Sequence, residues 1–364
     1  MNLIEKAKKL PSSPGVYLMK DSSGGILYVG KSKNLNQRVQ SYFQNSKNLS
    51  KKVEKLVSHL KDIDYIITDT EFEAFILECQ LIKELKPLYN KLMKCPQSYT
   101  YIEFDMADEL HTIKLTNEMS ENTSSLFFGP FSSKNTVVKA MKGLKELYKM
   151  ECNHTYNRKS PCLNYSLGLC MGICFQSSAV DKHNQIISRI IALLEGKDTS
   201  ILQEVKQQMI DASIHFDFEK AAKIRDCLTA LKSLLKKEKV IEFTKANQNI
   251  VVIEFLNDEQ LKLFLIHRNK ILYNHIFNLN ITNLKEIRQS VKATILEVFK
   301  IRESSPSDCI NKDEIDEANI IYSYLKSNAC EYLVISDDHL NPVNHHQLER
   351  VIDEFLFSKI KIKQ

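Results

Sequence analysis

The sequence lacks the features of an exported or membrane-bound protein. No apolar run approaches the ~20 residues that a membrane span needs. The residues after Met1 do not combine a basic start with an apolar core and a small-residue cleavage site. We therefore expect a cytoplasmic protein that has no membrane partner.

The composition is that of an ordinary globular protein, with 43% hydrophobic and 26% charged residues. Its 364 residues are enough for two or three domains, each able to bury a core. The net charge of +5 is small, but part of the excess is local, at Lys47, Lys51, Lys52, Lys55 and Lys61. Such a cluster suits a phosphate backbone, although taken alone it favours the solvated face of a helix.

Nine cysteines in a cytoplasmic protein are thiols or metal ligands more often than disulfides. Four of them are close in sequence, at Cys152, Cys162, Cys170 and Cys174, and the last three have the spacing C-x7-C-x3-C. A loop and a short helix can bring four thiolates at such a spacing around one centre. The alternative is four free, buried cysteines, and the spacing alone does not distinguish zinc from an iron–sulfur cluster.

Two short β-rich runs, at residues 14–17 and 27–31, flank a glycine-containing turn at residues 21–25 and predict a hairpin. The next segment, 34–43, repeats apolar residues at helical spacing. That spacing places Arg38 and Tyr42 on one stripe, so a cation and a phenol point the same way.

Glu78 is an acidic residue in an apolar helical context. If residues 71–83 form one helix, the neighbours of Glu78 at three and four residues' distance are all apolar: Ala74, Phe75, Leu81 and Ile82. An unpaired buried carboxylate costs on the order of several kcal/mol. We therefore expect Glu78 to be neutral, in a salt bridge or bound to a cation. A metal ion is the interpretation that also explains the residues around it.

Seven motifs follow one another along the first part of the chain: Gly15-Val16-Tyr17, Tyr28-Val29-Gly30, Lys31, Arg38, Tyr42, Glu78 and Lys86-Pro87-Leu88-Tyr89-Asn90. In this order they resemble the GIY-YIG nuclease domain, in the form found at the N-terminus of the bacterial excinuclease UvrC and its shorter homologue Cho. The resemblance implies that residues 1–95 are a small α/β nuclease domain. The sequence departs from the family at Gln80, where UvrC proteins usually have asparagine.

The resemblance also implies catalytic roles. Glu78 would hold one Mg²⁺ or Mn²⁺, and Arg38 would offer a fixed fork to the scissile phosphate. Tyr17 and Tyr28 are the candidates for activating water, with Tyr17 favoured by the family. A phenol is a poor base near neutral pH, so Lys31 or the metal must lower its pKa. Two further residues would orient the phosphate or complete the fold, namely Tyr42 and Asn90.

The rest of the chain predicts three regions and an α+β protein overall. Residues 96–180 connect to the nuclease domain and carry the cysteines, which resemble the UvrC ligands of a 4Fe–4S cluster, with zinc as the alternative. The gap between Cys152 and Cys162 is shorter than in the family, so His154 is the alternative to Cys152 as a ligand. Residues 181–242 are helical, and within them about 204–239 resemble the UVR motif by which UvrC docks onto UvrB. Residues 247–364 form an α/β domain that resembles the UvrC middle region.

Together these features predict a DNA endonuclease that makes the 3′-side incision at damage presented by UvrB, as Cho-like proteins do, and that is a monomer when alone. The alternative is a catalytically weak protein that binds UvrB and DNA. In UvrC a ribonuclease H-like domain would follow, and the chain stops at Gln364. The 5′-side incision is therefore not expected.

Overall fold

The computed structural model describes residues 3–44, 51–90, 100–118, 124–131, 133–152, 160–280, 284–300 and 312–360. Lys47 and His154 of the sequence predictions lie outside these ranges. The chain forms two compact units. One combines residues 1–96 with 243–364, and the other comprises residues 97–242. None of the described helices is long and apolar enough to cross a membrane.

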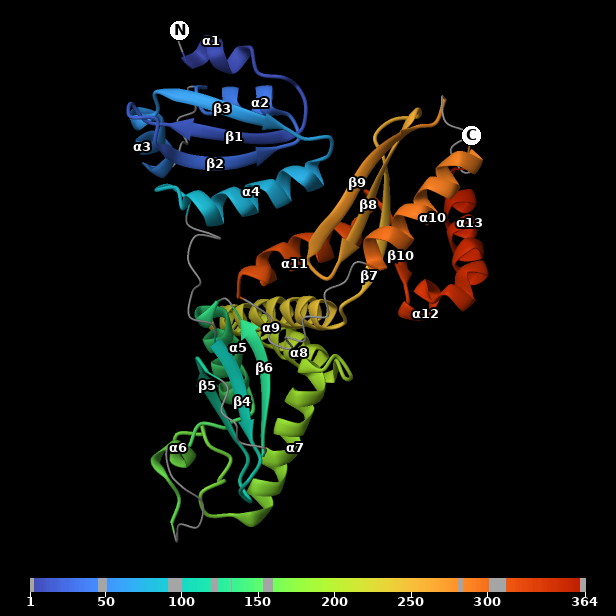
Figure 1. The fold of residues 1–364 in the computed structure, drawn as a ribbon. Coiled ribbons are helices and arrows are strands. Elements are labelled where there is room, and N and C mark those ends of the chain that lie inside the picture. The colour runs from blue at the N-terminus through green and yellow to red at the C-terminus, as the bar shows by residue number, and fades with distance from the viewer. Residues whose placement is uncertain are drawn as a thin grey trace. The chain divides into compact units, whose positions relative to one another are not determined.

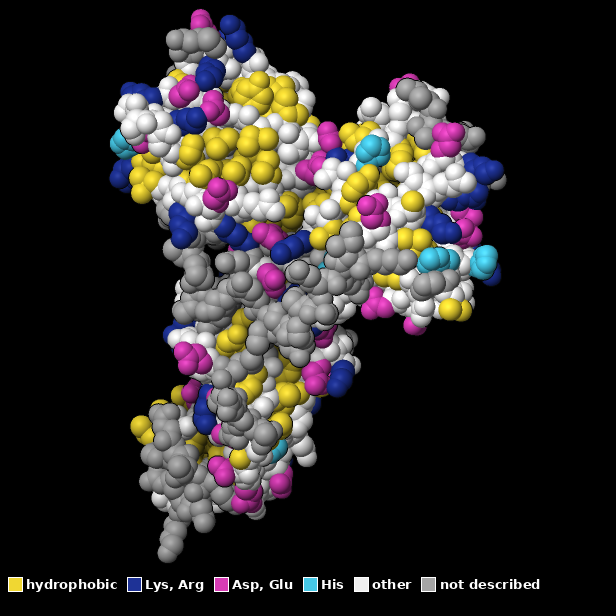
Figure 2. Space-filling view, viewed as in Figure 1, with side chains coloured by type: hydrophobic (Ala, Val, Ile, Leu, Met, Phe, Trp, Pro, Cys, Tyr) yellow, Lys and Arg dark blue, Asp and Glu magenta, His cyan; other side chains and the backbone are white. Residues whose placement is uncertain are grey.

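The N-terminal part of the first unit is a three-stranded antiparallel sheet between helices (Figure 1), which confirms the predicted hairpin. The strands are β1 (Gly15–Lys20), β2 (Ile26–Ser32) and β3 (Asp62–Ile67), in the order β2-β1-β3. One face packs against α4 (Glu71–Leu85), and the core on the other face includes residues of α1 (Leu3–Lys8), α2 (Leu35–Gln40) and α3 (Lys51–His59). On the face drawn in Figure 2, lysines and arginines of this part lie around an apolar patch.

Helix α4 has a well-defined start. The Thr70 hydroxyl accepts a hydrogen bond from the Glu73 backbone N–H, and the Glu73 carboxylate accepts one from the Thr70 N–H, both at 3.1 Å. This reciprocal capping box satisfies backbone donors that a helix otherwise leaves unpaired. The helix ends at Lys86, whose backbone is left-handed with a φ of 46°.

The second part of this unit is a four-stranded antiparallel sheet in the order β10-β7-β8-β9. It contains β7 (Asn249–Phe255), β8 (Gln260–His267), β9 (Lys270–Asn278) and β10 (Glu331–Ile335). The strands β7, β8 and β9 form an antiparallel meander, with a turn at Arg268-Asn269 between β8 and β9. Helices α10 (Leu284–Lys300) and α13 (His345–Ile360) cover one face, with α12 (Asp337–Leu340) beside them, whereas α11 (Lys312–Leu325) and α4 share a core with the other.

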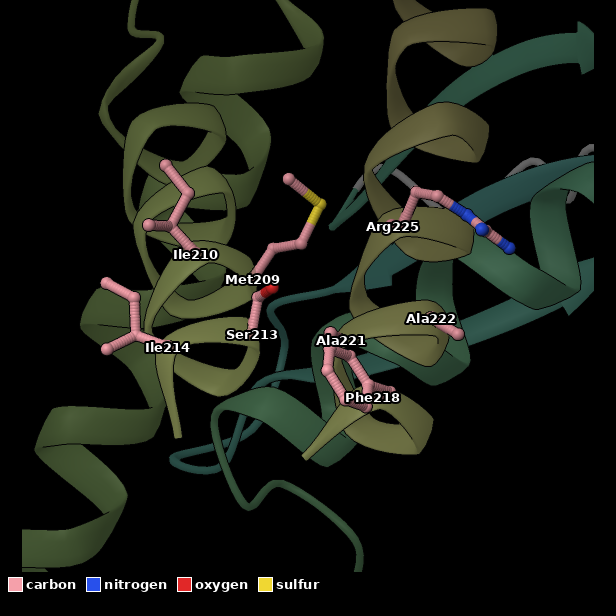
Figure 3. A pocket seen from close by; sticks show the side chains of 8 residues that line it. All are labelled: Met209, Ile210, Ser213, Ile214, Phe218, Ala221, Ala222 and Arg225. Carbon is pink, nitrogen blue, oxygen red and sulfur yellow. The ribbon is translucent and has the colours of Figure 1, made fainter. Parts of the chain in front are cut away.

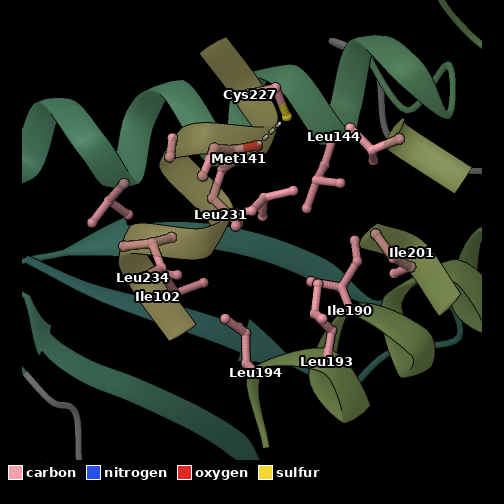
Figure 4. Close-up of a cluster of buried hydrophobic side chains, with 14 of the residues drawn as sticks. Ile102, Met141, Leu144, Ile190, Leu193, Leu194, Ile201, Cys227, Leu231 and Leu234 are labelled. Atoms are coloured by element: carbon pink, nitrogen blue, oxygen red, sulfur yellow. Dashed lines mark hydrogen bonds between the residues drawn. The ribbon is translucent and has the colours of Figure 1, made fainter. Parts of the chain in front are cut away.

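The second unit has one core built from both helices and strands (Figure 4). A sheet in the order β5-β4-β6 is formed by β4 (Thr100–Asp105), β5 (Thr112–Thr116) and β6 (Ser125–Phe131). Among the residues described in this unit, the helices are α5 (Lys134–Leu147), α6 (Leu163–Ser166), α7 (Ser177–Leu194), α8 (Ser200–Ile214) and α9 (Phe218–Lys245). The core joins Ile102 and Leu144 to Ile190 and Leu231, so packing continues across the division expected at residue 180.

Candidate functional site

Glu78 extends from the middle of α4 beside β2. One carboxylate oxygen, Oε1, accepts a hydrogen bond from the Lys31 backbone N–H at 3.0 Å. Burial raises the pKa of Glu78, while that hydrogen bond and the charges of Lys31 and Arg38 oppose the rise. Within the described part of the chain, no lysine or arginine forms an ion pair with this carboxylate. Glu78 is therefore a partly desolvated acid that lacks a permanent counter-ion.

The apolar surroundings predicted for Glu78 are only partly present. Ala74 and Ile82 are buried against β1 and β2, but Phe75 is 36% exposed. The Lys31 ammonium lies 3.4 Å from the centroid of the Phe75 ring. Glu78 is consequently half-buried and open to solvent on one side, which a ligand needs for access.

Three tyrosines meet next to this carboxylate. The hydroxyls of Tyr17 and Tyr42 are 2.8 Å apart and hydrogen-bonded, and both side chains are buried. The Tyr28 ring centroid lies 6.2 Å from that of Tyr17, and the charge of Glu78 contributes to the raised pKa of Tyr28. Tyr17 comes from β1, Tyr28 from β2 and Tyr42 from the turns that follow α2.

Arg38 lies against the same tyrosines, as the stripe with Tyr42 predicted. Its guanidinium carbon is 5.3 Å from the centroid of the Tyr42 ring. Asn34 caps α2 by accepting a hydrogen bond from the Gln37 N–H at 3.0 Å, which fixes the helix that carries Arg38. The positive charge of Arg38 opposes both the raised pKa of Tyr17 and that of Glu78.

The pKa values of the Tyr17 and Tyr28 phenols are both raised. Burial raises the pKa of Tyr17 well above its usual value, and Tyr42 and Tyr28 add to the effect. Burial also raises the pKa of Tyr28 to about 12. Ionisation of either phenol near neutral pH would require a nearby cation.

The Lys31 ammonium does not lie where it would favour a phenolate. It pairs with Glu71 at 2.5 Å and covers Phe75. The cation that opposes the raised pKa of Tyr17 is Arg38 instead. The sequence offers Lys31 or the metal for this role, and in the structure the Lys31 ammonium points to the first turn of α4.

Asn90 and Gly30 support the geometry of the site. The Asn90 side chain accepts from the Val29 N–H at 3.0 Å and donates to the Val29 carbonyl at 2.9 Å, so it holds β2 and completes the fold. Gly30 pairs with Tyr17 across the sheet, and a Cβ at position 30 would lie 2.4 Å from the Tyr17 hydroxyl. Only glycine leaves room for the tyrosine in this position.

Two charged residues beside the site were not singled out as site residues by the sequence. Lys52 on α3 lies 5.9 Å from the centroid of the Tyr28 ring, and Glu71 on α4 holds Lys31. Lys52 belongs to the predicted lysine cluster, which was the available signal. Nothing in the local sequence pattern marks Glu71, because its partner lies 40 residues away along the chain.

The four cysteines of the second unit form a separate cluster. Their sulfur atoms all lie within 4.8 Å of one another, and Cys152 and Cys162 are 3.9 Å apart. Three of the thiols are buried and Cys152 is partly exposed. Burial opposes ionisation of Cys162, but the Tyr165 backbone N–H and the neighbouring thiols lower its pKa overall. Four sulfur ligands around one point fit a soft metal or an iron–sulfur centre.

Helices α8 and α9 form an exposed hairpin in the same unit. The Asp217 carboxylate accepts a hydrogen bond from the Lys220 N–H at 3.1 Å at the start of α9. Between the two helices lies a groove of about 460 Å³ (Figure 3). It is lined by Met209, Ile210, Ser213, Ile214, Phe218, Ala221, Ala222 and Arg225. Farther along α9, Leu228 and Leu231 enter the core, whereas the end of the hairpin next to its turn is exposed.

Three family models match consecutive segments of this chain. A UvrC-like GIY-YIG domain matches residues 13–91, a UvrC/Cho excinuclease middle domain matches residues 99–193, and a UvrB/uvrC motif matches residues 199–234. This chain belongs to the UvrC family. The middle-domain model of the family covers the cysteine region, whereas the sequence interpretation used that term for residues 247–364.

UvrABC system protein C of Alkaliphilus oremlandii is 30% identical over 331 residues, covering 89% of this chain and 53% of the relative. The protein of that name from Clostridium tetani is 37% identical over 282 residues, or 76% of this chain and 45% of the relative. The chain spans about half the length of these UvrC relatives. A solved UvrC GIY-YIG endonuclease domain from Thermotoga maritima, bound to magnesium as its catalytic divalent cation, shares 35% identity. The match covers 25% of this chain and 100% of that domain, with a TM-score of 0.23.

Proposed function

We propose that this chain is a metal-dependent, structure-specific DNA endonuclease that makes the 3′-side incision of nucleotide excision repair. The observation that supports this most directly is Glu78, a partly buried carboxylate without an ion pair, placed beside Arg38 and three tyrosines. Membership of the UvrC family supports DNA damage as the context. Specificity would come from the damage complex, because no element of the proposed site reads base edges.

The residues present fit one hard divalent cation. A carboxylate oxygen is the donor that Mg²⁺ and Mn²⁺ prefer, and Glu78 is open to solvent on one side. A single protein carboxylate leaves the remaining coordination positions to water and phosphate oxygen. Such an ion, when bound, supplies charge neutralisation at a non-bridging phosphate oxygen. We therefore favour a one-metal site over a two-metal site.

The side chains of the site would divide the remaining work. Arg38 presents a planar fork that suits a phosphate and keeps its charge at any working pH. Tyr17 would take the proton from the attacking water, because its hydroxyl is held by Tyr42 and its phenolate is favoured by Arg38. Lys31 and Asn90 would hold β2 and α4 in place rather than touch the reacting atoms.

The hairpin of α8 and α9 supplies the proposed contact with UvrB. The end next to its turn exposes Phe216 by 79%, Phe218 by 63% and Ile214 by 64%. Exposed aromatic and aliphatic side chains beside a groove are typical of a surface that a partner helix covers. The match of residues 199–234 to the UvrB/uvrC motif supports UvrB as that partner.

For the cysteine cluster we propose a 4Fe–4S centre with a structural or positioning role, and zinc is the alternative. Hydrolysis of a phosphodiester needs no electron transfer, so the cluster has no evident part in the chemistry. Anaerobically purified protein is expected to show a broad visible absorption band. A colourless protein with one zinc per chain would replace the iron–sulfur assignment and leave the nuclease proposal untouched.

The nuclease proposal is tested with purified chain, UvrB, Mn²⁺ and a duplex carrying one lesion. We expect a single nick on the 3′ side, abolished by Glu78→Gln. The matched control is Glu84→Gln, which makes the same change at an exposed position of the same helix and should leave nicking intact. Binding to UvrB and DNA without a nick would instead support the catalytically weak binding protein.

A further inference from the structure

Helix α4, which carries Glu78, packs between two sheets of the same unit. One side, with Ala74 and Ile82, lies against β1 and β2. Another side carries Phe72, Ile76 and Cys79, all at least 93% buried, and these enter the core of the second sheet. Their partners there come from β7, β8 and α11: Ile250, Val252, Phe264, Ile266, Ile320, Ile321 and Leu325. The catalytic helix is thus shared between the nuclease sheet and the C-terminal sheet.

Aromatic packing fixes the first turn of α4 to the C-terminal sheet. The rings of Phe72 and Tyr324 are stacked, with centroids 3.9 Å apart and planes 5° from parallel. Phe264 meets the Phe72 ring edge-on at 5.4 Å. The Tyr324 hydroxyl donates to the Glu254 carboxylate at 2.6 Å, which holds the stacked ring in place. Such contacts set the angle and depth of a helix start, because aromatic rings tolerate little displacement in a packed core.

A buried lysine of the second sheet completes this contact. The Lys262 side chain is only 3% exposed, and its ammonium pairs with Asp69 at 2.5 Å and Glu73 at 3.0 Å. Glu73 is also the acidic member of the capping box with Thr70. A buried cation is tolerated only where nearby carboxylates compensate for its lost hydration. Lys262 therefore binds the charged groups that define where α4 begins.

The same turn of α4 connects to the site. Glu71 pairs with the Lys31 ammonium at 2.5 Å, and the Lys31 backbone N–H donates to Glu78 at 3.0 Å. We propose that Lys262 is a positioning residue for the nuclease site. By fixing the first turn of α4, it holds the Glu78 carboxylate in the orientation that binds the metal ion. The C-terminal sheet thereby contributes to the nuclease although it contacts no reacting atom, and this inference rests on the proposed function.

The test compares the full chain with its Lys262→Met variant, which keeps the length of the side chain and removes the charge. Lys292→Met is the matched control, because Lys292 pairs with Glu349 among the helices on the opposite face of the same sheet. Two measurements are made: hydrogen exchange of residues 71–79 in metal-free protein, and the Mn²⁺ concentration at half-maximal binding and at half-maximal nicking.

We expect Lys262→Met to speed hydrogen exchange in the first turns of α4. It should also raise the required Mn²⁺ concentration by about tenfold, as expected when a residue that orients a metal ligand is lost. Lys262→Arg should restore most of the affinity, and Lys292→Met should change neither quantity. If Lys262 had a purely structural role, Lys262→Met would lower the Tm, but the Mn²⁺ dependence measured below that temperature would stay unchanged. An unchanged Mn²⁺ dependence in Lys262→Met would overturn the proposal.

A second variant covers the case in which Lys262→Met does not fold. Asp69→Asn removes one exposed partner of Lys262 and leaves the capping box intact, and a rise of about threefold is expected. No shift in this variant would also overturn the proposal. Failure of the nuclease function is recognised separately, because wild-type protein would then not nick DNA at all. In that case the Mn²⁺ affinities of the wild type and the variants would still test the role of Lys262. A wild-type protein that binds no Mn²⁺ would overturn the proposal.

Discussion

The carboxylate site and the cysteine cluster are two metal-binding candidates built in opposite ways. The four cysteines come from one short segment, with a small surrounding core that includes Ile173 and Ala179. Glu78 comes from a helix held between two sheets, and its neighbours Tyr17, Tyr28 and Arg38 come from three other elements. The difference predicts that the cysteine region would depend on a bound metal for its stability, whereas the proposed nuclease site would be held in place by the fold before any metal binds.

The largest expected effect concerns the cysteine cluster. Cys174→Ser should remove the bound metal and strongly destabilise residues 97–242, because structural metal sites can contribute ~10 kcal/mol to folding. Metal content and thermal unfolding measure this. Cys330→Ser, outside the cluster, should retain full metal content. If Cys174→Ser loses its metal but keeps its Tm, the two sites do not differ in the way described above.

At the nuclease site, Arg38→Ala should lower the nicking rate by roughly 10²–10³-fold while the fold remains intact, because a cation aimed at a phosphate acts mainly on the transition state. Single-turnover nicking and circular dichroism measure the two quantities. Arg38→Lys should recover only part of the rate, since lysine lacks the planar fork. Arg350→Ala serves as control, because Arg350 is exposed and pairs with Glu354 far from the site in sequence. Equal rates for Arg38→Ala and wild type would leave Arg38 without a catalytic role.

The pH dependence identifies the base. Because burial raises the pKa of Tyr17, the reactive phenolate is a minor species at neutral pH, and nicking should rise with pH by up to about tenfold per unit. Tyr17→Phe should abolish this slope along with most of the activity, whereas Tyr28→Phe should keep the slope at a lower rate. Rates measured over a range of pH on either side of neutrality test this. A slope that disappears in Tyr28→Phe and persists in Tyr17→Phe would exchange the two assignments.

The smallest expected effect is on stability. Burial raises the pKa of Glu78 in the folded protein above its unfolded value, so the neutral acid favours folding at low pH and this contribution is lost as pH rises through the folded pKa. In metal-free protein at neutral pH, Glu78→Gln should therefore raise the Tm by a few degrees, and the gain should shrink at about pH 4. Thermal scans at both pH values measure it. A lower Tm at neutral pH would show that the carboxylate is stabilised by the fold after all.

Local pattern was sufficient for the parts of the site that lie on one element. Arg38 and Tyr42 could be paired because they are four residues apart, and Glu78 was conspicuous because its helical neighbours are apolar. The direction of the Lys31 ammonium was not predictable, since Glu71 lies 40 residues away. In the sequence, Lys262 looks like an ordinary polar residue in the polar–apolar alternation of a strand. Only the packing of α4 on that strand shows that its side chain is buried. No local pattern indicates that α4 serves two cores at once, because the second core forms with residues far along the chain.

The close approach of the Tyr17 hydroxyl to Gly30 has a practical consequence. Even an alanine at this position would push the Tyr17 phenol away from the Tyr42 hydroxyl. In a homologous sequence, the loss of this one glycine codon would therefore be a sign that the pair of tyrosines cannot form as it does here.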